Sequence, residues 1–192
     1  MLPKEVALVL TPSTMPSLGL AAPDFELPDV VSGRRFARDV LRRPKGLLVM
    51  FLCRHCPYVK HVQQELARLG RDYATREIGL VAISSNDARA YPDDAPDSLA
   101  EMARELGFRF PLLYDEAQSV ARAFGAACTP DFFLYDAGLR LVYRGQLDDS
   151  RPDSGKPVTG RDLRAALDTV LAGRPVPQEQ RPSLGCNIKW RA

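Results

Sequence analysis

A buried strand that runs directly into an amphipathic helix constrains the fold of this chain most strongly. Residues 46–53 are apolar without alternation, which is typical of a strand covered on both faces, as in a parallel sheet. From Pro57 onward, apolar residues recur at steps of three and four, which predicts one face of a helix. The chain therefore contains a predicted β-α unit, and two cysteines, Cys53 and Cys56, lie at its junction.

The remaining segments repeat this alternation. A hairpin is expected over 25–36, further strands over 78–85, 110–114, 131–135 and 139–143, and helices over 98–107, 116–124 and 163–171. Ser98 with Glu101, and Thr159 with Asp162, have the spacing of capping boxes for two of these helices. This order predicts an α/β fold with a central mixed sheet flanked by helices.

The length of 192 residues, with 45% hydrophobic and 26% charged residues, suits one globular domain. Four prolines in the first 23 residues predict an irregular lead-in over 1–17. We therefore expect one domain over 18–173, preceded by this lead-in. A Pro-rich C-terminal tail over 174–192 follows and carries Cys186.

Charge and hydropathy exclude several kinds of partner. Lys and Arg total 26 against 24 Asp and Glu, so the net charge of +2 gives no electrostatic reason to expect nucleic acid or an anionic membrane. The longest apolar run, 47–53, is much shorter than the roughly 20 residues of a membrane-spanning helix. The acidic runs at 93–97 and 148–149 lack calcium-loop spacing, so we expect solvated loops there.

The N-terminal segment contains no apolar region of the length that a secretory signal needs, so the expected location is the cytoplasm. This compartment is reducing, and cysteines there are more often catalytic or metal-binding than structural. The C-x-x-C spacing brings Cys53 and Cys56 close enough for a disulfide. The start of a helix favours a thiolate through its free N–H groups and its dipole. Arg54 and His55 can add positive charge beside the thiolate. Cys53 and Cys56 are therefore predicted to be a redox-active dithiol. We expect no organic cofactor.

A zinc site is the main alternative for the same cysteines. The other candidate ligands are His55, His61, Cys128 and Cys186, and none has zinc-finger spacing. We therefore assign no metal. A metal-binding module that uses the dithiol with His61 or Cys186, or an inert pair of thiols, remains open.

Several motifs together resemble a known family. The buried strand, the C-x-x-C motif and Thr129-Pro130 before a hairpin and a last helix resemble the thioredoxin superfamily. The segment 22–28, Ala-Pro-Asp-Phe-Glu-Leu-Pro, resembles the opening of its redoxin branch, which includes alkyl hydroperoxide reductase-type, thiol-specific antioxidant peroxiredoxins. Motifs over 53–60, 85–92, 128–131 and 182–190 are similar to a peroxiredoxin-like thioredoxin-family group of bacterial proteins.

This resemblance implies a thioredoxin-like fold with an N-terminal hairpin extension and a C-terminal tail. It also implies that Pro130 follows a cis peptide bond and, with Thr129, shapes a groove beside the dithiol. In disulfide exchange, Cys53 would be the nucleophile and Cys56 the resolving thiol. The substrate would be a disulfide-containing protein or small molecule, and a separate reductant would recycle the pair.

A thiol peroxidase, with Cys56 or Cys53 as the peroxidatic residue, is the alternative that the same resemblance implies. Pro57 matches the peroxiredoxin pattern, but Cys53 stands where that pattern has threonine, and Val49 stands where it has proline. These departures favour disulfide exchange over peroxide reduction. His55 occupies the position that strongly oxidising disulfide donors fill with histidine, so we expect a pair more oxidising than thioredoxin.

The two other cysteines have open roles. Cys128 lies two residues before Pro130, so it is expected near the dithiol, either as a redox partner or as a buried apolar residue. Cys186 lies in the tail, where it is either a resolving thiol, within the chain or across a homodimer, or an inert packed thiol.

Overall fold

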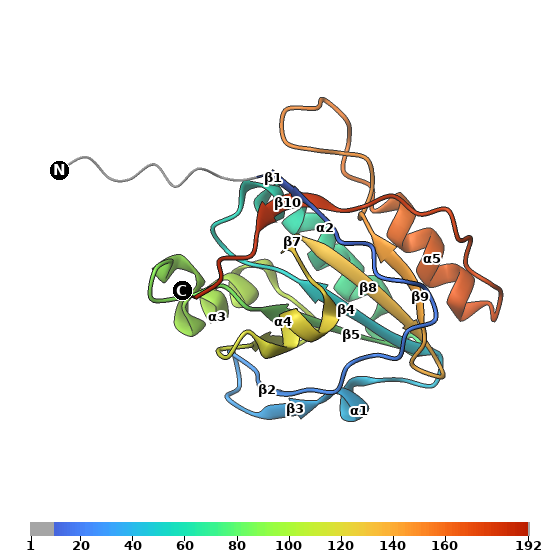
Figure 1. The fold of residues 1–192 in the computed structure, drawn as a ribbon, viewed down its shortest axis with the longest axis horizontal. Helices are drawn as coiled ribbons and strands as arrows, with labels where there is room; N and C mark the ends of the chain where they lie inside the picture. The colour runs from blue at the N-terminus through green and yellow to red at the C-terminus, as the bar shows by residue number, and fades with distance from the viewer. Residues whose placement is uncertain (1–9, 192) are drawn as a thin grey trace.

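The computed structural model describes residues 10–191 and contains a central mixed sheet (Figure 1). Its strands are β4 (Gly46–Phe51), β5 (Ile78–Ser84), β6 (Leu112–Tyr114), β8 (Asp131–Asp136) and β9 (Leu141–Gly145). β8 pairs antiparallel with both β4 and β9, and β5 pairs parallel with β6. The Leu52 N–H donates to the Ile83 carbonyl at 3.0 Å, which joins the ends of β4 and β5. The predicted α/β class is confirmed.

Helices cover both faces of this sheet (Figure 1). They are α2 (Pro57–Tyr73), α3 (Pro96–Leu106), α4 (Ser119–Phe124) and α5 (Arg161–Leu171). Side chains of β4 alternate between two hydrophobic clusters: Leu48 packs with α2, α3 and α5, whereas Phe51 packs with α4. All six residues of β4 are buried, as the unbroken apolar run predicts.

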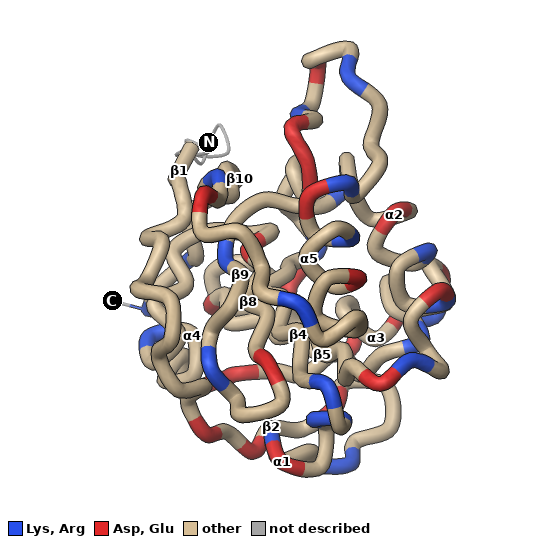
Figure 2. The backbone as a smooth tube through the Cα atoms, turned by 90° about the vertical axis from the view of Figure 1, so that its right-hand side faces the viewer, with Lys and Arg blue, Asp and Glu red and all other residues tan. Residues whose placement is uncertain are grey.

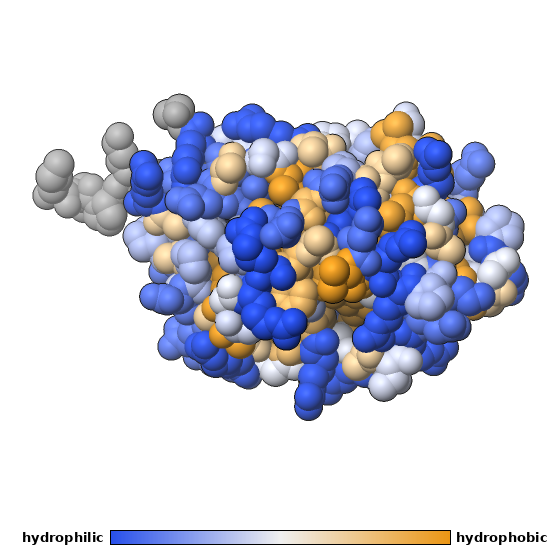
Figure 3. All heavy atoms as spheres, turned by 90° about the horizontal axis from the view of Figure 1, so that it is seen from below, coloured by the Kyte–Doolittle hydropathy of each residue, from blue (hydrophilic) through white to orange (hydrophobic). Residues whose placement is uncertain are grey.

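The hairpin is formed by β2 (Glu26–Pro28) and β3 (Arg35–Ala37), and the short helix α1 (Arg38–Leu41) follows it. Figure 3 views the molecule from below, the side on which these elements lie in Figure 1. Hydrophobic residues gather at the centre of this face with hydrophilic residues around them. Val31 and Val40 are the large hydrophobic residues that this segment exposes.

A second, small sheet consists of β1 (Leu10–Pro12), β10 (Leu184–Asn187) and β7 (Cys128–Thr129). β10 lies in the middle and pairs antiparallel with both neighbours. The lead-in is predicted to be irregular and the tail to be Pro-rich, yet each supplies a strand. The pairing places the tail directly beside the segment that precedes Pro130.

Both capping-box predictions are wrong. α3 begins at Pro96 after Ala95, and no side chain caps it. Ser98 and Glu101 instead bind the Arg54 guanidinium, at 2.9 Å from the Ser98 hydroxyl and 2.6 Å from the Glu101 carboxylate. A proline at the first helical position needs no N–H acceptor there, which leaves both side chains free for Arg54.

The start of α5 is capped from another loop. The Asp148 carboxylate accepts the N–H groups of Thr159 at 2.7 Å and of Gly160 at 2.6 Å, so Asp162 is not the capping group. Asp148 is therefore buried, and the expectation that 148–149 is a solvated loop is wrong for this residue. In the first turn of α5, the N–H groups of Asp162 and Leu163 donate to the Leu147 carbonyl at 3.2 Å, so a backbone group of the same loop caps the helix and Asp148 holds the two residues before it.

Charged residues of both signs are interspersed along the helices and along the protruding loop that precedes α5 (Figure 2). This distribution agrees with the small net charge of +2. Within residues 10–191, no helix combines the length and hydrophobicity that spanning a bilayer requires.

Candidate active site

The two cysteines of the C-x-x-C motif lie where β4 ends and α2 begins. Cys56 is the residue that caps α2, with Pro57 at the first helical position. Both cysteines are fully buried free thiols. The Sγ atom of Cys53 lies 3.1 Å from the Thr129 hydroxyl, and that of Cys56 lies 3.4 Å from the Thr129 carbonyl oxygen. Three of the predicted site residues therefore meet in one place.

Pro130 lies beside this cluster, between β7 and β8. The Thr129–Pro130 peptide bond is cis in the structure. Thr129 presents both its hydroxyl and its carbonyl oxygen to the dithiol, so the segment before Pro130 forms one wall of the site.

The surroundings shift the pKa values of the two thiols in opposite directions. Burial raises the pKa of Cys53 most, the interaction with the Cys56 thiol comes next, and the nearby Asp94 carboxylate adds to the rise. Interactions with the thiols of Cys186 and Cys53 lower the pKa of Cys56, and the backbone N–H of Val59 at the start of α2 adds to this. Negative charge in the closed site is therefore favoured on Cys56.

Asp94 is the functional residue that the sequence patterns missed. It was assigned to a solvated acidic run, but it is fully buried. Its carboxylate accepts the His55 imidazole at 2.5 Å, the Arg54 N–H at 2.7 Å and the Asn86 amide at 2.8 Å. Burial opposes ionisation of Asp94, but the hydrogen bonds from His55 and Asn86 outweigh it and lower the pKa of this carboxyl.

The position of Asp94 in the strand order of the sequence could have indicated its place near Cys53. It lies in the loop after β5, and the ends of β4 and β5 meet at the Leu52–Ile83 hydrogen bond. Residues that follow neighbouring strands of an α/β sheet converge at one edge. Asp94 therefore lies near Cys53 although 40 residues separate it from Arg54.

The two residues between the cysteines differ in role. The Arg54 guanidinium pairs with Glu101 at 2.6 Å and with Glu105 at 3.6 Å, so α3 neutralises its charge. His55 stacks on the Tyr91 ring with centroids 5.2 Å apart, and its Nε2 atom is buried without a partner among the described residues. The positive charge that Arg54 and His55 were expected to add beside Cys53 is therefore offset by the Asp94 carboxylate and by the carboxylates of α3.

The structure brings Cys186 to the dithiol. It lies opposite Thr129 in the β10–β7 pairing and is buried. Its thiol interacts with the thiol of Cys56 and with the backbone N–H of Tyr58 at the start of α2. The interaction with the Cys56 thiol raises the pKa of Cys186 most, and burial adds to the rise.

Cys128 is also buried, but it precedes Thr129 in β7, so its side chain points to the opposite face. Its Sγ atom lies 3.9 Å from the Pro130 carbonyl oxygen. Burial raises the pKa of Cys128, and the buried Asp131 carboxyl adds to the rise. Among the four cysteines, Cys128 is the one that the strand geometry directs away from the site.

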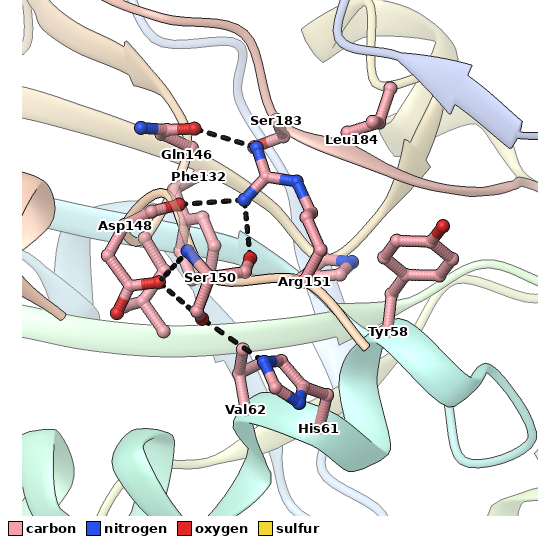
Figure 4. Close-up of a pocket in the computed structure, with 12 residues that line it drawn as sticks. Tyr58, His61, Val62, Phe132, Gln146, Asp148, Ser150, Arg151, Ser183 and Leu184 are labelled. Atoms are coloured by element: carbon pink, nitrogen blue, oxygen red, sulfur yellow. Dashed lines mark hydrogen bonds between the residues drawn. The ribbon is translucent and has the colours of Figure 1, made fainter. Parts of the chain in front are cut away.

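A pocket adjoins Pro130 on the side of α2 and the loop after β9 (Figure 4). Tyr58 and His61 line it from α2, and Arg151 lines it from the loop. His61 Nε2 lies 3.1 Å from the Ser150 hydroxyl (Figure 4), so the structure does not bring this histidine to the dithiol.

The candidate metal ligands group differently from the expected sets. Among residues 10–191, the one group of three or more such residues comprises Cys53, His55 and Asp94, whose ligand atoms lie within 4.8 Å of one another. His55 and Asp94 already bind each other, and Asp94 also accepts two further donors. The three side chains therefore form a hydrogen-bonded His55–Asp94 pair beside the Cys53 thiol.

Comparison with known proteins identifies a family and near structural relatives. A model of the AhpC/TSA family matches residues 18–144. An uncharacterized conserved protein from Geobacillus kaustophilus is 52% identical, with a TM-score of 0.95 over 97% of this chain and 98% of that one. A hypothetical protein from Sinorhizobium meliloti 1021 is 49% identical, with a TM-score of 0.92 over 95% and 99%.

More distant structures share the fold alone. A thiol:disulfide interchange protein of the thioredoxin family from Chlorobium tepidum TLS is 18% identical, with a TM-score of 0.62 over 81% of this chain and 99% of that one. Peroxidoxin BcpB from Mycobacterium tuberculosis is 22% identical, with a TM-score of 0.57 over 81% and 94%. No match is found among curated proteins.

Proposed function

Because the chain belongs to the AhpC/TSA family, a redoxin family with a thioredoxin-like fold, we propose that it is a thiol–disulfide oxidoreductase. This proposal rests on one observation: the Cys53 and Cys56 thiols both contact Thr129 at the start of α2. A vicinal pair of thiols at a helix N-terminus is suited to form and break one disulfide.

The two cysteines divide the reaction between them. Cys53 attacks one sulfur of the substrate disulfide as a thiolate, which its raised pKa makes the minor form of this residue in the substrate-free site. The attack forms a mixed disulfide and releases the first substrate thiolate. The Cys56 thiolate then attacks Cys53, forms the Cys53–Cys56 disulfide and releases the second thiolate. The environment that lowers the pKa of Cys56 favours this resolving attack. A separate reductant returns the pair to two thiols.

The test is reduction of a model protein disulfide with a dithiol reductant as the electron source. Cys53→Ser should abolish the activity. Cys56→Ser should abolish it as well but accumulate a mixed disulfide on Cys53. Cys128→Ala, a buried thiol directed away from the site, is the matched control and should keep the activity. Activity that persists in Cys53→Ser would overturn the assignment.

Thiol peroxidase is the second candidate, and one observation favours it. Cys56, next to Pro57, is the thiol whose pKa is lowered, and a thiolate is the form that attacks peroxide. Peroxide consumption that depends on Cys56 and survives Cys53→Ser would support this candidate. Stoichiometric metal in the purified protein, with neither activity, would support the metal-binding alternative.

We further propose that the exchange takes place in the cytoplasm and that the partners are a disulfide-containing molecule and a reductant. The net charge of +2, with both signs interspersed, supports recognition through the dithiol without nucleic acid or a membrane (Figure 2). A homodimer remains an alternative arrangement that sedimentation would test.

A further inference from the structure

The tail strand β10 covers the dithiol and points one cysteine at it. In the antiparallel β10–β7 pair, Cys186 is directly opposite Thr129. Opposed residues of such a pair project to the same face of the sheet. Because the Thr129 hydroxyl lies 3.1 Å from the Sγ atom of Cys53, the Cys186 side chain faces the dithiol as well.

The close approach of β10 depends on the residue before Cys186. A Cβ atom on Gly185 would lie 2.0 Å from the Thr129 carbonyl oxygen, so a side chain at this position is excluded by the backbone. Glycine is the residue that allows this contact. The strand is thus built to lie against the segment that precedes Pro130.

Hydrogen bonds hold the tail on both sides of Cys186. Before it, the Ser183 hydroxyl donates to the Gly145 carbonyl at 2.5 Å. After it, the Ile188 N–H donates to the Ala127 carbonyl at 3.0 Å, and the Lys189 N–H donates to Asn86 at 2.8 Å. These anchors fix the position of the Cys186 thiol within the site.

Cys56 is the central thiol of the three. It interacts with Cys53 on one side and with Cys186 on the other, whereas Cys53 has Cys56, Thr129 and Asp94 as its neighbours. All three thiols are buried in one hydrophobic cluster. Cys56 is therefore the thiol that lies next to both of the others.

We propose that Cys186 is a third redox thiol, which exchanges with the Cys53–Cys56 disulfide to form a Cys56–Cys186 disulfide. The Cys186 thiolate attacks the Sγ atom of Cys56, the bond from Cys56 to Cys53 breaks, and Cys53 leaves as a thiolate. The proton lost by Cys186 is taken up by Cys53, so one disulfide and one thiol remain and no further oxidant is needed. The product ties the tail covalently to α2.

The inference rests on the proposed function, since it starts from a redox-active Cys53–Cys56 pair. The first test removes Cys53. The Cys53→Ser variant is treated with diamide, which takes one hydrogen from each of two thiols, and its disulfides are mapped by mass spectrometry after acid quenching. We expect a linked peptide that contains Cys56 and Cys186. The same linkage should persist in Cys53→Ser with Cys128→Ala and be absent in Cys53→Ser with Cys186→Ser.

Two results would overturn the proposal: Cys186 remains a free thiol in the oxidised Cys53→Ser protein, or Cys56 is linked to Cys128 or to a second chain. The second test uses the wild-type protein, so it does not depend on folding of the variant. After oxidation, acid quenching and alkylation in denaturant, we expect one population with Cys186 alkylated and another with Cys53 alkylated. Cys186→Ser should lose the second population.

The wild-type map also separates this inference from the proposed function. If only the Cys53–Cys56 disulfide forms and Cys186 is always alkylated, the proposed function stands and the role of Cys186 is excluded. If Cys56 pairs with Cys186 and never with Cys53, the proposed C-x-x-C exchange fails while the reactivity of Cys186 stands.

Discussion

The buried carboxylate of Asp94 accepts a hydrogen bond from the His55 imidazole, with 2.5 Å between Oδ2 and Nδ1. This pair lies beside Cys53, and the negative charge of Asp94 contributes to the raised pKa of that thiol. The histidine of the C-x-x-C motif therefore acts together with an acidic partner. A model based on helix dipole and flanking cations alone would give the wrong direction for Cys53.

Replacement of Asp94 by asparagine should lower the pKa of Cys53, because a nearby like charge is removed. The ultraviolet absorbance of the thiolate, followed against pH in a Cys56→Ser background, measures this change. Asp93→Asn is the matched control, since Asp93 is the exposed neighbour in the same turn. An unchanged titration in Asp94→Asn would show that the carboxylate does not influence Cys53.

Thr129→Val should raise the pKa of Cys53 further. Valine keeps the shape of threonine but removes the hydroxyl that lies 3.1 Å from Sγ and lowers the pKa of this thiol. A hydrogen bond contributes about 1 kcal/mol, so disulfide reduction should slow by roughly fivefold. Thr169→Val, which removes a helix-surface hydroxyl bonded to Ala165, should leave the rate unchanged. An equal rate in both variants would contradict a role for the Thr129 hydroxyl.

Gly185→Ala should release the tail from the dithiol, because its Cβ would collide with the Thr129 carbonyl. We expect the buried thiols to react with a disulfide reagent about tenfold faster or more, the factor that corresponds to ~1.4 kcal/mol. Gly138→Ala is the control, since a Cβ there meets its nearest neighbour at 3.4 Å. Equal thiol reactivity in the two variants would mean that β10 does not limit access.

Asp131 should make stability depend on pH. Complete burial raises the pKa of this carboxyl to about 7, above its value in the unfolded chain. The folded protein therefore keeps a proton that the unfolded chain loses, so stability falls as the pH rises from about 4 to about 7.

The free energy of unfolding, measured by denaturant at about pH 5 and about pH 8, should be lower at the higher pH by up to about 3 kcal/mol, since the loss extends over the interval from pH 5 to the folded pKa of about 7. Asp131→Asn should remove most of this fall, whereas Asp97→Asn, at an exposed position, should retain it. A wild-type protein that is equally stable at both pH values would exclude an ionised Asp131 as the cause.

The parts of the fold that periodicity encodes were predictable. The run 46–53 and the helix from Pro57 bury enough apolar surface to show a local pattern. The hairpin around Gly33 was predictable from its turn residues, since neither of its strands contains a buried residue. The C-x-x-C motif is equally local, so the position of the dithiol followed from it.

Features that depend on distant partners were not predictable. β7 and β10 span only 128–129 and 184–187, too short for a periodic pattern, and each is a strand because of the other. Asp94 is buried because donors from another loop satisfy its carboxylate, and nothing in an acidic run distinguishes such a residue from a solvated one. The capping-box predictions failed for the same reason. The Arg54 guanidinium binds the Glu101 carboxylate, and the Asp148 carboxylate accepts the Gly160 N–H at the start of α5.

The position of β10 between β1 and β7 also orders the events of synthesis. β10 emerges from the ribosome after every other described strand and helix, so β4, α2 and β7 can assemble the dithiol before its cover exists. Until then β1 has no neighbour in its sheet, because its partner is β10. Pairing of Leu10 with Cys186 joins residues from nearly opposite ends of the chain, a contact of high sequence separation that forms late. The nascent protein thus passes through a stage in which Cys53 and Cys56 lack the cover that β10 gives them in the finished fold.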